Sequence, residues 1–166
     1  MKVVVAGSTG LAGSAISAAF SAQGHQVIGL NRSVVDLLDG EATKRFLVSA
    51  KPDLVIDAAA KVGGIGANNT FPVEFLADNI TIQGNLMSAA HAAGVENFVF
   101  LGSSCIYPRD CAQPIKEEYF DDRSARGHKL CICDRKDCRY RTNQFIPKGI
   151  WDSMDFVDAY KSLWAA

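Results

Sequence analysis

The sequence predicts an α/β fold, a Rossmann-like doubly wound parallel sheet that is truncated and followed by an irregular C-terminal tail. Short apolar runs rich in β-branched residues alternate with helical segments as far as residue 104. The first run leads into a glycine-rich turn, Gly7–Gly13. Parallel neighbours cannot be joined by a tight hairpin, so this alternation calls for crossover helices on both faces of a sheet.

The first strand is predicted at 2–7, KVVVAG, because an unbroken β-branched run that ends in glycine is typical of a strand buried on both faces. The following elements are predicted in order: a helix over 12–23, the strand QVIGL at 26–30, a helix around 40–50, the strand DLVIDAAA at 53–60, a long helix from about 72 to 93 and the strand NFVFLGSS at 97–104.

Composition indicates an ordinary globular chain of 166 residues, with 48% hydrophobic and 21% charged residues and a net charge of −1. This charge gives no reason to expect nucleic acid or an acidic membrane as a partner. Gly7, Gly10 and Gly13 interrupt the N-terminal apolar run where a signal peptide would continue, and no apolar stretch is long enough to cross a bilayer. Five cysteines without a secretion signal are typical of reduced thiols, so we expect a cytoplasmic protein.

The composition changes near Tyr119. Residues 1–118 hold 8 basic and 11 acidic side chains, whereas residues 119–166 hold 9 and 7, with three of the five cysteines. We therefore expect an NAD(P)-binding Rossmann-like domain of the epimerase/dehydratase type over 1–118 and a separate tail over 119–166.

The string GSTGLAG lies between the first predicted strand and the first predicted helix. In this context the first glycine permits a tight turn, the second lets a pyrophosphate approach the backbone, and the third lets helix and strand pack closely. The helix N-terminus also offers free N–H groups to phosphate. A glycine-rich turn without a ligand is the alternative. The predicted cofactor-binding residues here are Gly7, Ser8, Thr9, Gly10, Leu11, Ala12 and Gly13.

Asn31 and Arg32 follow the second predicted strand, where an NAD-binding fold usually has an acidic residue for the adenosine ribose. An arginine can pair bidentately with a 2′-phosphate, which favours NADP(H) over NAD(H) as the cofactor. A solvated surface arginine is the other interpretation. In the string DLLD, Asp36 and Leu37 either line the adenine pocket or belong to a segment that caps the next helix.

Two longer strings are more specific: AAAKVGGIGANNTFPVEFLADNITIQGN at 58–85 and FLGSSCIYP at 100–108. Together with AGSTGLAGSAI, they resemble the GDP-L-fucose synthases, a family of the extended short-chain dehydrogenase/reductase superfamily, over residues 3–118. The resemblance implies NADPH binding, epimerisation of GDP-4-keto-6-deoxy-D-mannose at C3 and C5, and reduction of the C4 ketone to give GDP-L-fucose. It also implies a GDP-sugar substrate and a homodimer.

The resemblance makes Ser103 and Cys105 the candidate catalytic residues. A serine there can donate a hydrogen bond to the ketone oxygen, and a cysteine thiolate can remove the acidic proton from a carbon next to a ketone. A strand-end cap and a small buried filler are the structural alternatives for these two residues. Further cofactor contacts are predicted from the same strand end: Leu101, Gly102 and Ser104.

Three further features of this part of the chain have open interpretations. The resemblance implies that the glycine-rich stretch Lys61–Asn69 shapes the sugar pocket, and a flexible loop is the alternative. Asn79 and Asn85 share one side of the long predicted helix, where they either hold a polar site or face solvent. His91 is expected at the surface.

The tail departs from the family. The resemblance calls for Tyr-Ala-Ile-Ala-Lys, in which the tyrosine protonates the alkoxide and the lysine assists it, and no such motif follows residue 118. Codons can be chosen for Leu130–Lys136 that read Tyr-Ala-Tyr-Ala-Ile-Ala-Lys one nucleotide later. For Met154–Ala165 the same shift gives Met-Pro-Thr-Asn-Leu-Tyr-Gly, another family string. We therefore predict that the chain from about Phe120 onward is an out-of-frame translation, disordered or loosely collapsed, and that this chain lacks the parent activity.

The tail also contains residue types that could form a metal site or a nucleic-acid-binding surface. Its four candidate zinc ligands lack paired CxxC knuckles, so no metal site is predicted. Its basic residues alternate with aspartates and have no aromatic platform, so nucleic-acid binding is not expected. The competing function is a catalytically silent NADP-binding protein whose tail recruits a metal or a partner. The four candidate ligands are His128, Cys131, Cys133 and Cys138.

Overall fold

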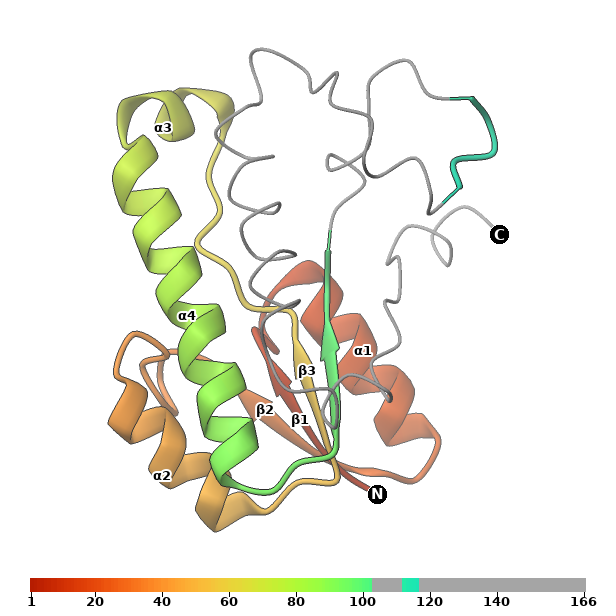
Figure 1. Cartoon of the computed structure of the whole chain (residues 1–166). Helices are drawn as coiled ribbons and strands as arrows, with labels where there is room; N and C mark the ends of the chain where they lie inside the picture. The colour runs from red at the N-terminus through yellow and green to blue at the C-terminus, as the bar shows by residue number, and fades with distance from the viewer. Residues whose placement is uncertain (103–111, 117–166) are drawn as a thin grey trace.

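The computed structural model describes residues 1–102 and 112–116. Four strands and four helices form this part of the chain (Figure 1). The tail predicted over 119–166 lies outside it. The elements are β1 (Lys2–Ala6), α1 (Leu11–Ala22), β2 (Gln26–Leu30), α2 (Gly40–Ala50), β3 (Leu54–Asp57), α3 (Ile65–Thr70), α4 (Pro72–Ala92) and β4 (Asn97–Phe100).

The strands form one sheet in the order β2-β1-β3-β4, and every pairing is parallel. Val3 of β1 lies opposite Val27 on one side and Leu54 on the other. All four carboxyl ends therefore meet at one edge of the sheet, and the predicted parallel α/β architecture is confirmed.

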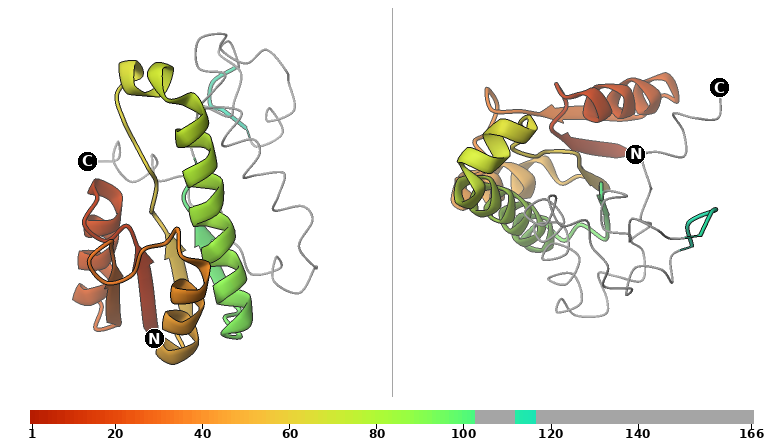
Figure 2. Two further views of the ribbon diagram at one scale, coloured as in Figure 1. Left: turned by 90° about the vertical axis from the view of Figure 1, so that its left-hand side faces the viewer. Right: turned by 90° about the horizontal axis from the view of Figure 1, so that it is seen from above.

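Alternate residues of β1 enter two separate cores. Val4 packs in a cluster with Leu47 of α2 and Leu86 of α4, whereas Val5 packs in a second cluster, against Ile16 of α1. Seen from above, α1 lies on one side of the sheet and α2 and α4 on the other (Figure 2). Both faces are covered, so β1 is buried throughout its central residues, as its unbroken run of valines predicts.

Helix α3 occupies part of the stretch Lys61–Asn69, for which a flexible loop was the alternative interpretation. The Asn68 side chain donates from Nδ2 to the carbonyl oxygens of Gly63 (2.8 Å) and Gly64 (3.0 Å), and the Thr70 hydroxyl donates to that of Gly66 (2.9 Å). These side-chain bonds support a short helix that contains Gly66, a residue of low helix propensity. Among the helices of the described ranges, none is long and apolar enough to cross a membrane.

Candidate functional site

The turn after β1 is built around two glycines that no other residue could replace without movement. Gly7 has a φ of 76°, and a Cβ there would lie 2.6 Å from the Ala58 carbonyl oxygen. A Cβ at Gly13 would lie 2.1 Å from the carbonyl oxygen of Gly7. The tight turn and the close packing expected from the glycine spacing are therefore both present, which brings the start of α1 against the end of β1.

The N-terminus of α1 faces this turn without a side-chain cap. Gly10 is the N-cap residue, no side chain accepts a capping hydrogen bond from the first N–H groups, and no acidic residue lies in the first turn. A Cβ at Gly10 would meet only the Gly7 carbonyl oxygen, at 3.2 Å. The first N–H groups of a helix carry partial positive charge, so this open end is suited to a phosphate group.

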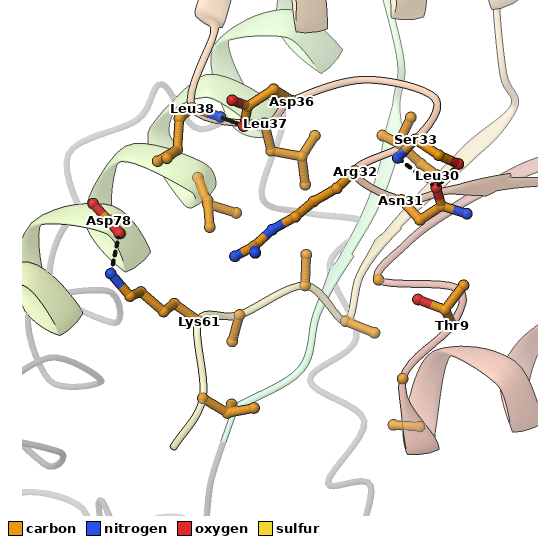
Figure 3. A pocket seen from close by; sticks show the side chains of 18 of the residues that line it. Thr9, Leu30, Asn31, Arg32, Ser33, Asp36, Leu37, Leu38, Lys61 and Asp78 are labelled. Carbon is orange, nitrogen blue, oxygen red and sulfur yellow. Dashed lines mark hydrogen bonds and ion pairs between the residues drawn. The ribbon is translucent and has the colours of Figure 1, made fainter. Parts of the chain in front are cut away.

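A cleft with a volume of about 620 Å³ opens at the carboxyl ends of β1, β2 and β3 (Figure 3). This volume lies in the ordinary range for small-molecule sites. Most of the predicted cofactor-binding residues line the cleft, but Ser8, Gly13, Leu101 and Gly102 do not. The predicted residues that line it are Gly7, Thr9, Gly10, Leu11, Ala12, Arg32, Asp36 and Leu37.

The segment after β2 forms one wall of the cleft. Asn31 Oδ1 accepts hydrogen bonds from the Ser33 N–H (2.8 Å) and hydroxyl (2.6 Å), which closes a local turn. Arg32 lies at this turn, and its exposed side chain extends into the cleft (Figure 3). The turn therefore presents a guanidinium group at the end of the second strand.

The string DLLD both lines the cleft and caps α2. Asp36 lines the cleft, and its Oδ1 accepts from the Leu38 N–H at 3.0 Å. Asp39 caps α2, because its Oδ1 accepts from the Ala42 N–H at 2.9 Å.

The opposite wall is the chain that follows β3, and it carries a second cation that the site prediction missed. The Lys61 ammonium lies 2.6 Å from Asp78 Oδ2 and 5.3 Å from the centroid of the Phe75 ring. Figure 3 shows Arg32 and Lys61 entering the cleft from opposite walls. The position of Lys61 after a predicted strand of a parallel sheet was the signal that could have identified it.

Helix α4 runs beside both walls. Asn79 is buried and Asn85 is half-buried, so the solvent-facing alternative for these two residues is wrong. Both make hydrogen bonds to chain segments that line the cleft. His91 is exposed, as expected.

The candidate catalytic residues Ser103 and Cys105 lie outside the described residues, as do Ser104 and the four candidate zinc ligands of the tail. The last described residues before them follow β4 at the carboxyl edge of the sheet. There the Leu101 N–H donates to the Asp57 carbonyl oxygen at 3.1 Å.

A parallel sheet covered on both faces, a glycine turn that leads into an uncapped helix, and a cleft at the carboxyl edge together define a Rossmann-type nucleotide-binding domain. A family model described as the NAD dependent epimerase/dehydratase family matches residues 3–130. The chain belongs to this family.

Individual relatives agree with that assignment. The chain is 36% identical to a GDP-L-fucose synthase of Sinorhizobium fredii over 173 residues, covering 97% of this chain and 55% of that protein. It is 44% identical to the Escherichia coli GDP-L-fucose synthase over 117 residues, covering 70% and 36%. A solved structure of MlghC, a GDP-mannoheptose C4 reductase from Campylobacter jejuni with NADP bound, has a TM-score of 0.74 and 27% identity, covering 87% and 48%. The chain thus spans about half or less of the length of these proteins.

Proposed function

We propose that the cleft binds NADP(H), and that the chain is the dinucleotide-binding part of an enzyme of the GDP-L-fucose synthase type. The observation that carries the proposal is that a single cleft connects the glycine turn, the uncapped start of α1 and Arg32. A pyrophosphate and a 2′-phosphate are the two anionic parts of NADP(H), and these features suit each of them.

The topology supports one orientation of the cofactor. Gly10–Ala12 would hold the pyrophosphate, Arg32 would hold the adenosine ribose with its 2′-phosphate, and Asp36–Leu38 would hold the adenine. The wall at Ala58–Val62 would then hold the nicotinamide half. The residues present fit this arrangement, because Gly7 and Gly10 line the cleft beside the uncapped start of α1. When bound, NADPH would supply the hydride that reduces a C4 ketone.

The proposed substrate class rests on the similarity of this chain to its relatives. The relatives named as GDP-L-fucose synthases support a GDP-sugar substrate. The roles of Ser103 as hydrogen-bond donor to the ketone of a 4-keto-6-deoxy sugar and of Cys105 as epimerisation base stay predictions from the family resemblance. A homodimer and a cytoplasmic location belong to the same proposal.

The tail is the part in which this chain departs from an active enzyme. We propose that residues from about Phe120 onward are read out of frame, because a shift of one nucleotide restores two family strings at separate places. Sequencing the coding DNA across residues 119–122, in comparison with related genes, tests this. An inserted or deleted nucleotide supports it, and an intact frame shared with related proteins overturns it.

Titration of the full 166-residue chain with NADPH and with NADH, followed by nicotinamide fluorescence, tests the cofactor. We expect NADPH to bind at least about tenfold more tightly than NADH, because only NADPH carries the 2′-phosphate. Equal affinities contradict the assigned role of Arg32. A folded chain that binds neither dinucleotide contradicts the proposed function.

A further inference from the structure

Two asparagine side chains of α4 hold the two walls of the cleft. They lie six positions apart on α4, which is about 9 Å along the helix axis and roughly 120° around it. Asn79 bonds to the wall that follows β3, and Asn85 bonds to the wall that precedes α2. One rigid helix therefore connects both walls.

Asn79 brackets the backbone of Lys61. Its Oδ1 accepts from the Lys61 N–H at 2.8 Å, and its Nδ2 donates to the Lys61 carbonyl oxygen at 3.0 Å. Nδ2 also donates to the Phe75 carbonyl oxygen at 2.7 Å, one turn earlier in the helix. Asn79 is only 6% exposed, so water cannot readily replace these bonds if the side chain is shortened.

Asn85 fixes the other wall. Its Nδ2 donates to the Leu37 carbonyl oxygen at 2.8 Å and to that of Leu38 at 3.2 Å. A Cβ at Gly40 would lie 2.8 Å from Asn85 Oδ1, so a glycine at the start of α2 leaves room for this amide. Both carbonyls belong to residues that line the cleft.

We propose that Asn79 and Asn85 are positioning residues for the two halves of the dinucleotide. Asn79 positions the wall at the nicotinamide half, and Asn85 positions the wall at the adenosine half. The inference rests on the proposed function, from which the orientation of the cofactor follows. A wall that is already ordered loses less conformational entropy when a ligand binds, so release of either wall weakens the binding of the half that it contacts.

The variants Asn79→Ser and Asn85→Ala separate the two walls, with NADPH and adenosine 2′,5′-bisphosphate as probes of the whole cofactor and of its adenosine half. A serine at position 79 can still bond to the carbonyl four residues earlier but is too short to reach Lys61. Asn97→Ala is the matched control. Its Nδ2 donates to the Asp53 carbonyl oxygen at 3.2 Å, where β3 and β4 begin, at the edge of the sheet away from the cleft.

Calorimetric titration of the full chain and its variants tests the inference, and the expected pattern is as follows. Asn79→Ser is expected to weaken the binding of NADPH by about tenfold and to change the affinity for the bisphosphate by less than about twofold. Asn85→Ala is expected to weaken the binding of both probes by a similar factor. Asn97→Ala changes neither. Equal weakening of both probes by Asn79→Ser, or no weakening by either variant, overturns the inference. If the unaltered chain binds neither probe, the proposed function itself fails.

Amide hydrogen exchange in the unaltered chain gives a second readout that does not depend on how a variant folds. The Lys61 N–H donates to a buried acceptor, so its exchange is expected to be slow although it lies outside every helix and strand. Exchange of the Lys61 N–H at the rate of an unprotected loop amide would contradict its hydrogen bond to Asn79 Oδ1.

Discussion

At the scale of single residues, the guanidinium of Arg32 is the group that we expect to select NADP(H). It stands at the turn after β2 and enters the cleft without an ion-pair partner among the described side chains. We predict that Arg32→Ala weakens NADPH binding by about tenfold to a hundredfold and changes NADH binding by less than about threefold, because only a charge-assisted contact with the 2′-phosphate is lost.

Arg45→Ala is the matched control for that titration. Arg45 is an exposed arginine on α2 that does not line the cleft, so its removal changes the net charge by the same amount without touching the site. Equal losses of NADPH affinity in the two variants would mean that general electrostatics, rather than a contact at Arg32, governs binding.

Gly13 and Gly84 are both helical glycines, and their substitution by alanine is expected to change the stability of the protein in opposite directions. A Cβ at Gly13 would lie 2.1 Å from the Gly7 carbonyl oxygen, whereas a Cβ at Gly84 would meet nothing within 4 Å. We predict that Gly13→Ala lowers the free energy of unfolding by about 1–3 kcal/mol or more, and that Gly84→Ala raises it by about 0.5–1 kcal/mol. Urea unfolding measures both. Similar effects at the two sites contradict the close contact between α1 and the turn.

At the scale of elements, α2 depends on its cap. The Asp39 carboxylate accepts from the Ala42 N–H at 2.9 Å, and Glu41 adds a negative charge in the first turn. Asp39→Ala is expected to lower the free energy of unfolding by about 1 kcal/mol. Asp39→Asn is expected to retain most of the stabilisation by the cap, because an asparagine also caps well. The urea midpoints of the two variants check this. A loss with asparagine as large as with alanine would show that the charge of Asp39 matters more than its hydrogen bond.

The strands and long helices could be predicted from the sequence because their signals are local. The β-branched run at β1 and the proline at the first position of α4 each identify an element without knowledge of the fold. Helix α3 could not be predicted in this way. Gly66 disfavours a helix, and the bonds made by Asn68 that support it become visible only in three dimensions.

The residues of the site likewise fall into those with local sequence signals and those without. The glycine turn and Arg32 have fixed positions relative to predicted strand ends, so spacing alone locates them. Lys61, Asn79 and Asn85 act through partners that are distant in sequence, such as the bond from Asn85 to Leu37 across 48 positions. The sequence could place the two asparagines on the same long helix but could not identify which segments they contact.

At the scale of the whole molecule, the proposed enzyme needs a proton donor that the tail does not supply in this frame. We predict that the purified 166-residue chain, free of longer enzyme, oxidises no NADPH in the presence of GDP-4-keto-6-deoxy-D-mannose, even where it binds the cofactor. Absorbance of NADPH at the nicotinamide band follows the reaction. Detectable ketone reduction by the chain itself would show that the Tyr-x-x-x-Lys motif is dispensable here and would remove the basis for the frameshift proposal.

The most direct measurement of the central claim is hydrogen–deuterium exchange of the full chain with and without saturating NADPH. If the cleft holds the dinucleotide as proposed, protection concentrates in the three segments that form it: the glycine turn with the start of α1, the turn at Asn31–Leu38, and the wall at Ala58–Val62. Protection by bound NADPH that spares these segments would contradict the account.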